Sequence, residues 1–163
     1  MTNSFFYDFS LCGEKIALAI AEEDGYITGI YFGELPQKLV TNMKETAPIQ
    51  ACAEQLTEYF AGKRKVFDIQ TKLSGTSFQQ SVWNYLKTIP FGQTRTYKNV
   101  SRETLHNDKG SRACGMACNK NPLPIIIPCH RIIGSNGALT GYAGGIALKK
   151  KLLELEAEKL NAR

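Results

Sequence analysis

A cysteine beside a histidine is the part of the sequence whose residue types most directly suggest chemistry. Cys129 lies between Pro128 and His130. A thiolate is a strong nucleophile, but a free thiol has a pKa of about 8.5, so Cys129 needs a base, a positive field or both at neutral pH. His130 is the nearby base. Because adjacent residues on an extended chain point to opposite faces, we expect its ring to reach the sulfur through a water molecule.

A histidine that acts as a base is often oriented by a carboxylate, and the C-terminal helix offers one. Its leucines form an apolar arc at helical spacing, made of Leu148, Leu152, Leu153, Leu155 and Leu160. Glu156 falls within this arc, whereas Glu154 and Glu158 fall outside it. A carboxylate in a buried stripe needs a partner. An ion pair with any lysine or arginine would supply one; the functional alternative is a Cys129–water–His130–Glu156 relay.

A short apolar run precedes the cysteine and must position it. Leu123–Ile127 is interrupted and flanked by prolines. Because proline is restricted in sheets, we expect a short strand that ends where Cys129 begins. A cysteine there could also be a small core residue. His130 and Arg131 follow at once, which is poor composition for a core, so we expect the thiol to open to a pocket.

Residues 1–75 have the pattern of a small α/β scaffold domain. Three antiparallel strands are expected, the last two joined by a turn at Glu23-Asp24-Gly25: Phe5–Phe9, Lys15–Ala21 and Tyr26–Phe32. Helical spacing that begins near Pro48 predicts one helix. Lys65–Ile69 is a further candidate strand, and the polar stretch Gln70–Ser77 is the expected linker.

Residues 76–163 are expected to form a second, mainly helical domain, which makes the chain α+β. Ser77 is a possible N-cap of a helix that ends at Pro90. Thr96 can cap a short helix that contains Val100. The loop His106–Gly110 then leads to another short helix, and the two together predict a helix-turn-helix.

The last of these helices, within Ser111–Asn121, is built mostly from small residues. Arg112 and Lys120 are its cations. A helix that reads the major groove of DNA usually carries long polar side chains, which this one lacks. It could instead enter the minor groove, which is about 6 Å wide, or pack closely inside the protein. Spacing alone favours neither alternative.

Charge is distributed unevenly along the chain. The net charge is +5, with 7 Lys+Arg and 10 Asp+Glu in residues 1–75 against 13 and 5 in residues 76–163. The second half, at +8, suits a polyanion, although a basic surface that only aids solubility fits the same count. No apolar run is long enough to span a membrane, and the N-terminus lacks a signal-peptide pattern.

The cysteines and histidines argue against a disulfide framework or a metal site. Five cysteines is an odd number, which favours reduced thiols in the cytoplasm. No C-x-x-C pair occurs, and His106 and His130 are the only histidines. We therefore expect no metal and no other cofactor.

Several blocks over residues 76–160 together resemble the O6-alkylguanine-DNA alkyltransferases, specifically the bacterial Ogt-type methylated-DNA–protein-cysteine methyltransferases. These blocks are Phe78-Gln79…Val82-Trp83, Pro90-Phe91-Gly92…Thr96-Tyr97, Ser111-Arg112-Ala113…Asn119…Asn121-Pro122, Pro128-Cys129-His130-Arg131 and Gly141-Tyr142-Ala143-Gly144-Gly145. The resemblance implies a ribonuclease H-like N-terminal domain and a winged-helix-like C-terminal domain. It also implies DNA repair by irreversible transfer of an alkyl group from O6-alkylguanine, with O4-alkylthymine as a further candidate substrate. The acceptor would be Cys129, used once per molecule.

The resemblance further implies residue roles. Tyr97 would protonate the departing guanine, Asn121 would hold the turn that presents Cys129, and Arg112 would replace the flipped base in the stack. The other expected DNA contacts are Lys98, Ser135, Ala113 and Gly115. The expected pocket walls are Tyr142, Ala143, Ile132 and Met116. Some relatives have serine where this chain has Ala143, so any contact to O6 there would come from the backbone N–H.

Other function classes fit the sequence less well. A non-catalytic protein that binds alkylated DNA would not need the reactive cysteine, and Cys129 is present. A cysteine hydrolase would need an oxyanion hole, but neither the basic half nor the small-residue helix. The preferred prediction is a monomer whose partner is double-stranded DNA that carries O6-alkylguanine, with no membrane and no metal.

Overall fold

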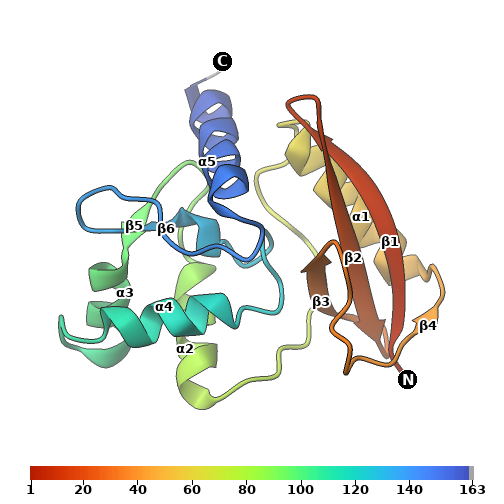
Figure 1. Cartoon of the computed structure of the whole chain (residues 1–163), viewed down its shortest axis with the longest axis horizontal. Helices are drawn as coiled ribbons and strands as arrows, with labels where there is room; N and C mark the ends of the chain where they lie inside the picture. The colour runs from red at the N-terminus through yellow and green to blue at the C-terminus, as the bar shows by residue number, and fades with distance from the viewer. Residues whose placement is uncertain (162–163) are drawn as a thin grey trace. The chain divides into compact units, whose positions relative to one another are not determined.

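The computed structural model describes residues 1–161 and divides into two compact units, one of residues 1–74 and one that begins at Gly75. Figure 1 shows the strands of the first unit and the helices of the second. The α+β class predicted from the sequence is confirmed. Each unit is described by itself below.

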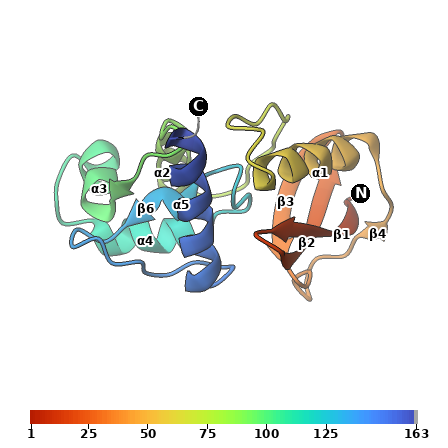
Figure 2. The ribbon, with the colours of Figure 1, turned by 90° about the horizontal axis from the view of Figure 1, so that it is seen from above.

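The first unit is a sheet with one helix. The sheet has the order β3-β2-β1-β4, and its strands are β1 (Asn3–Leu11), β2 (Glu14–Glu23), β3 (Tyr26–Phe32) and β4 (Asn42–Met43). The single helix, α1 (Ala47–Phe60), packs along one face of the sheet (Figure 2). It buries its apolar stripe there, including Ile49, Leu56 and Tyr59.

Both hairpins of this sheet turn through two residues in the left-handed conformation. Cys12 and Gly13 have φ angles of 51° and 81°, and Asp24 and Gly25 have 54° and 88°. Two-residue turns with positive φ match the right-handed twist of paired strands. Glycine reaches these angles without strain, and aspartate tolerates them better than most residues. The turn predicted at residues 23–25 is therefore present.

The sheet has one strand more than the three expected. β4 pairs in parallel with the start of β1, and two exposed residues carry no periodic signal that could have predicted it. The candidate strand Lys65–Ile69 does not form. The backbone N–H and C=O of Asp68 instead bond the side-chain amide of Gln55 on α1, both at 2.9 Å, so this side chain replaces a neighbouring strand.

The second unit is mainly helical. Its elements are α2 (Ser77–Leu86), β5 (Arg95–Thr96), α3 (Tyr97–Leu105), α4 (Ser111–Asn119), the 3-10 turn η1 (Cys129–Arg131), β6 (Ile132–Ile133) and α5 (Ile146–Asn161). Thr96 caps α3 as predicted, in a capping box with Asn99. The cap of α2 is Thr76 rather than Ser77, because Gln79 closes the box with Thr76.

The helix-turn-helix of α3 and α4 is fixed by a buried serine. Ser101 accepts a hydrogen bond from the Gly110 N–H at 2.9 Å and donates one to the Asn107 carbonyl at 2.6 Å. A Cβ on Gly110 would lie 2.2 Å from a methyl group of Leu105. A larger residue at position 110 would therefore displace the Leu105 side chain. The turn joins α3 to α4 (Figure 1).

The apolar run before Cys129 is a tight turn and not the strand expected. The Ile127 N–H donates to the Leu123 carbonyl at 2.8 Å, and Ile125 has a φ of 76°. Prolines at 122, 124 and 128 lack the N–H groups that a strand ladder needs. The cysteine is thus presented by a compact loop.

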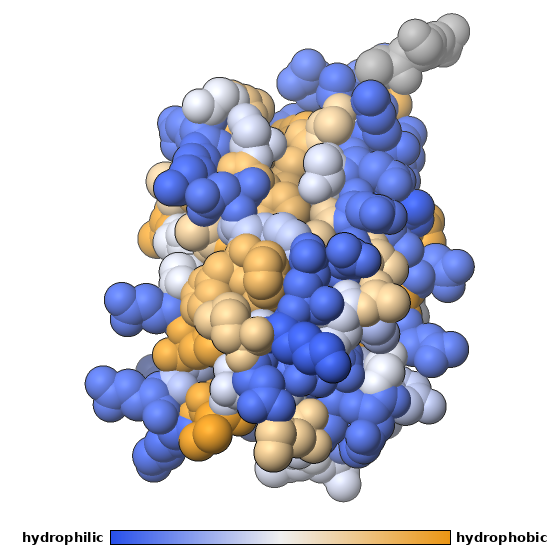
Figure 3. Space-filling model, turned by 90° about the vertical axis from the view of Figure 1, so that its right-hand side faces the viewer, coloured by the Kyte–Doolittle hydropathy of each residue, from blue (hydrophilic) through white to orange (hydrophobic). Residues whose placement is uncertain are grey.

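The surface has mixed character. The face drawn in Figure 3 is mostly hydrophilic, with hydrophobic clusters between the polar residues. Among residues 1–161, no helix combines the length and the apolar character that crossing a membrane requires.

Candidate alkyl-transfer site

Cys129 and His130 lie on the 3-10 turn η1 and not on an extended chain. The Cys129 N–H donates to the Ile127 carbonyl at 2.8 Å, and the Arg131 N–H donates to the Pro128 carbonyl at 3.0 Å. Successive residues of a 3-10 helix are about 120° apart, so the expectation of opposite faces was wrong in detail. The two side chains still diverge, which leaves the thiol and the ring on different sides of the turn.

Cys129 lines a small cavity. The cavity has a volume of about 10 Å³ and is lined by Cys118, Asn119, Asn121, Pro124, Cys129, Gly141, Tyr142 and Ala143. That volume suits about one water molecule. The structure therefore brings Asn121, Tyr142 and Ala143 together with Cys129, as the predicted site requires.

Asn121 ties the cysteine loop to the end of α4. Its side-chain amide donates to the Ile127 carbonyl at 2.8 Å and accepts from the Leu123 N–H at 3.0 Å. Its backbone N–H donates to the Cys118 carbonyl at 3.1 Å. One residue thus holds both ends of the turn that presents Cys129.

A wider surface hollow adjoins this cavity. It has a volume of about 450 Å³ and is lined by Tyr97, Ser111, Arg112, Gly115, Met116, Asn119, Thr140 and Gly141. Asn119 and Gly141 line both spaces. A planar group in the hollow would therefore lie directly outside the thiol cavity, beside Arg112 and the ring of Tyr97.

The remaining predicted residues lie elsewhere. Ile132 is fully buried in β6 and does not line the cavity. Lys98 is 4.0 Å from Asp108 on the turn after α3. Ala113 is exposed on α4, and Ser135 is exposed in the loop after β6. Met116 lines the outer hollow and not the thiol cavity.

Behind the thiol, a buried cluster joins His130, Arg131 and Glu156. Nε2 of His130 lies 3.0 Å from Oε1 of Glu156, and an ionised carboxylate only accepts, so Nε2 carries the proton. The Arg131 guanidinium donates to both carboxylate oxygens at 2.7–3.1 Å and to the Ile89 carbonyl at 2.6 Å. Both partners considered for Glu156, an arginine and the histidine, therefore bind it.

This cluster overturns the argument from composition. His130 is 0% and Arg131 6% exposed, although their charged types are rarely buried unless paired. Glu156 provides the pairing, and the guanidinium also lies 5.8 Å from the centre of the Phe91 ring. A core thus forms around charged residues because their charges are satisfied locally.

Burial and neighbouring charges shift the pKa values in opposite directions. Burial raises the pKa of the Cys129 thiol, while the Asn121 amide and the Lys149 ammonium lower it. Burial lowers the pKa of His130, although Glu156 acts in the opposite direction. The ring is therefore neutral at pH 7. Burial would raise the pKa of Glu156, but the hydrogen bonds from His130 and Arg131 hold it at about 2.

Lys149 is a site residue that the sequence analysis missed. It is completely buried, and its Nζ donates to the Thr140 carbonyl at 2.9 Å and lies 5.8 Å from the centre of the Tyr97 ring. Tyr97 donates to the same carbonyl at 3.2 Å. The signal was available: Lys149 precedes Glu156 by seven residues, which places both on one helical face.

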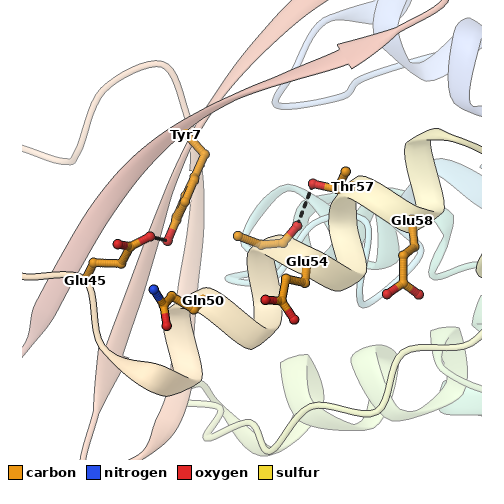
Figure 4. Close-up of a pocket in the computed structure, with 7 residues that line it drawn as sticks. Tyr7, Glu45, Gln50, Glu54, Thr57 and Glu58 are labelled. Atoms are coloured by element: carbon orange, nitrogen blue, oxygen red, sulfur yellow. Dashed lines mark hydrogen bonds between the residues drawn. The ribbon is translucent and has the colours of Figure 1, made fainter.

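A further hollow lies on the first unit and has different chemistry. It has a volume of about 520 Å³ and is lined by Tyr7, Glu45, Gln50, Ala53, Glu54, Thr57 and Glu58. In Figure 4 the carboxylates of Glu54 and Glu58 project from α1, and the Tyr7 hydroxyl bonds Glu45. No thiol or imidazole lines it. Within residues 1–161, no three His, Cys, Asp or Glu side chains gather as metal ligands would.

Comparison with known families covers almost the whole chain. Residues 77–158 match the 6-O-methylguanine DNA methyltransferase, DNA binding domain, and residues 6–73 match the ribonuclease-like domain of the same family. Both matches lie within the two units that the structure separates.

Curated relatives carry one activity name. A methylated-DNA–protein-cysteine methyltransferase of Methanosarcina acetivorans is 50% identical over 76% of this chain and 76% of its own length. The constitutive enzyme of that name from Bacillus subtilis is 42% identical over 85% of this chain and 88% of its own.

Solved structures agree with these sequence matches. The crystal structure of Mycobacterium tuberculosis OGT in complex with DNA has a TM-score of 0.87 and 38% identity, and it covers 96% of this chain and 94% of that protein. The chain therefore belongs to the 6-O-methylguanine DNA methyltransferase family and is a methyltransferase of DNA repair.

Proposed function

We propose that Cys129 is the acceptor of the alkyl group and that the substrate is O6-alkylguanine in double-stranded DNA. One observation carries this proposal: Cys129 lines a cavity that adjoins a hollow lined by Tyr97 and Arg112. A base that entered the hollow would direct its substituent toward the sulfur. The family relationship supplies the reaction class.

Thiolate formation would run through the buried cluster. Glu156 holds Nε2 of His130 protonated, so Nδ1 is the nitrogen that can take the thiol proton through one water molecule. The resulting thiolate is stabilised by the Lys149 ammonium and the Asn121 amide, both of which lower the pKa of Cys129 against the effect of burial. Proton removal and charge stabilisation thus come from different residues.

The transfer itself is an in-line displacement at the alkyl carbon. A bond forms between the Cys129 sulfur and that carbon, the bond from the carbon to O6 breaks, and guanine leaves with the electron pair. The Tyr97 hydroxyl, at the edge of the hollow, protonates the departing base. The product is a thioether, which is a poor leaving group, so each molecule reacts once.

In this proposal residues 1–75 are a scaffold domain, and residues 76–163 are the domain that recognises DNA and accepts the alkyl group. The alkyl carbon lies inside the duplex, so the base must be flipped out. Arg112 stands at the start of α4 and lines the hollow, so it can fill the vacated place in the stack. The small exposed residues of α4 let its backbone approach the minor groove.

The protein would act as a monomer in the cytoplasm, where thiols stay reduced.

The decisive experiment is mass spectrometry of the tryptic peptide that contains Cys129. The protein is incubated with a duplex that contains one O6-methylguanine and digested with trypsin, and peptide 121–131 is examined for one added methyl group. We expect one equivalent on Cys129 and none in Cys129→Ser. Cys12→Ser, at an exposed hairpin turn of the first unit, is the matched control and should react fully. An unmodified peptide 121–131 with an intact lesion would refute the proposal.

A further inference from the structure

The cavity beside the proposed acceptor is also lined by a second cysteine, which has no part in the proposed transfer. Cys118, in the last turn of α4, lines the same cavity as Cys129, and each of the two is 8% exposed. The cavity between its walls has room for about one water molecule. Cys114, one turn earlier on the same helix, is buried outside this cavity with its sulfur 3.8 Å from the Thr104 hydroxyl.

Asn121 links the backbones of the two cysteines. Its N–H bonds the Cys118 carbonyl, and its side chain bonds the Ile127 carbonyl, which also accepts from the Cys129 N–H. Charge couples the thiols as well. Burial raises the pKa of Cys118 to about 12, and the Lys149 ammonium lowers the pKa of this thiol as it does that of Cys129. Both cysteines therefore line one cavity, and the charge of Lys149 acts on both thiols.

We propose that Cys118 and Cys129 form a reversible disulfide when a peroxide oxidises the site. Cys118 is then the resolving cysteine, and the pair is a modification site that protects a thiol used only once. The value of this protection rests on the proposed role of Cys129 as acceptor. The bond itself does not depend on that role.

The chemistry needs one hydroperoxide and two thiols. The Cys129 thiolate attacks a peroxide oxygen, so that an S–O bond forms, the O–O bond breaks and hydroxide leaves to become water with the thiol proton. The Cys118 thiolate then attacks the sulfenic sulfur, so that an S–S bond forms and the S–O bond breaks. The hydroxide leaves as a second water with the Cys118 proton. The two sulfurs lose two electrons and the peroxide gains them.

The alternative fate of the sulfenic acid is loss of the protein. Further peroxide converts a sulfenic acid to a sulfinic acid, which ordinary thiols do not reduce. A disulfide is reduced by a dithiol and returns both cysteines. A nearby resolving thiol therefore decides whether oxidation of Cys129 is reversible.

The test compares three proteins under hydrogen peroxide: wild type, Cys118→Ser and the matched Cys114→Ser. After free thiols are blocked, tryptic peptides are mapped, and methyl acceptance from O6-methylguanine duplex is measured before oxidation and after reduction with dithiothreitol. Wild type and Cys114→Ser should link peptide 113–120 to peptide 121–131 and recover acceptance. Cys118→Ser should give no link, accumulate sulfinic Cys129 and lose its recovery, relative to its own acceptance before oxidation.

Two results would overturn the proposal. One is full recovery in Cys118→Ser, and the other is a link that disappears in Cys114→Ser. Cys118→Ala repeats the test without a buried hydroxyl, in case the serine variant folds poorly. Peptide mapping needs no DNA, so a disulfide in a protein that never accepts a methyl group would refute the proposed function and leave the redox pair intact.

Discussion

Two buried charges on α5 set the electrostatics around Cys129 and His130. Lys149 supplies the positive charge beside the sulfur, and Glu156 orients the ring while it pairs with Arg131. A thiol buried without a cation would stay protonated, since burial disfavours the charged form. The reactivity of Cys129 therefore depends on residues about twenty and more positions downstream.

Lys149→Met should raise the pKa of the Cys129 thiol and slow transfer. Loss of the ammonium removes a charge that opposes the effect of burial. A higher pKa leaves a smaller fraction of thiolate at neutral pH, and the transfer rate should fall in the same proportion. The pH profile of methyl acceptance, or of iodoacetamide alkylation, measures this shift. Lys150→Met is the control, because Lys150 is exposed on the same helix and lies 3.9 Å from Glu154. An equal shift in the control would contradict a local effect.

Glu156→Gln should destabilise the fold by about 3–5 kcal/mol, because it leaves the buried Arg131 charge without its carboxylate. Urea unfolding measures the loss, and Glu154→Gln, at an exposed position, should change little. The pKa of Glu156 is lowered from 4.5 to about 2 on folding. Its stabilisation is therefore complete above pH 4.5 and declines as the pH falls toward 2, because the unfolded state takes up the proton first. Wild type should lose its advantage over Glu156→Gln in that window.

At the scale of elements, a helix cap, a side-chain hydrogen bond and a short strand pair decide where the site residues lie. Thr96 caps α3 and so fixes Tyr97 as the first helical residue, and Asn121 joins the end of α4 to the loop before Cys129. β5 and β6 pair in parallel, which holds the start of α3 against the residues that follow η1. Such contacts add little core area, but they align three separate segments around the thiol cavity and the hollow that adjoins it.

Thr96→Ala should lower stability by about 1 kcal/mol and also slow methyl transfer. The cap satisfies a backbone N–H of α3, and its loss loosens the turn that carries Tyr97. Thr76→Ala removes an equivalent capping box from α2, where no proposed site residue follows. It should lose similar stability without the slower transfer. Thermal unfolding and single-turnover rates, measured on both variants, separate the two effects; equal slowing in both would mean that the capping acts only through stability.

At the scale of the whole molecule, the two halves differ in charge, −3 for residues 1–75 and +8 for residues 76–163. The second unit holds the proposed site. Asp108, an acidic residue on its helix-turn-helix, is neutralised by its ion pair with Arg102. A positive field on the unit that binds a polyanion assists association, whereas an acidic hollow such as that of Tyr7, Glu54 and Glu58 repels phosphate.

DNA affinity should fall steeply with salt, because each neutralised phosphate releases counterions. A plot of log affinity against log salt gives the number of contacts. Lys98→Gln should reduce the slope by about one. Lys15→Gln changes an exposed lysine of the first unit by the same charge and should leave the slope unchanged. Equal changes in both would show that net charge, and not the second unit, sets the salt response.

The sequence determined those features that depend on local periodicity and short-range hydrogen bonds. The limits of β3, the cap at Thr96 and the burial of Glu156 follow from residues only a few positions apart. The resemblance over residues 76–160 added the reaction class, because several motifs in order are far more specific than one.

Tertiary structure decided what depends on distant segments. It placed Glu156 between His130 and Arg131, buried an arginine that composition assigned to the surface, added β4 and turned Leu123–Ile127 into a loop. It also placed Cys118 and Cys129 in the lining of one cavity. For Glu156, Arg131 and β4 the physical reason is the same: burial of a charge or pairing of a strand is favourable only when its partner is present, and the partner comes from another part of the chain.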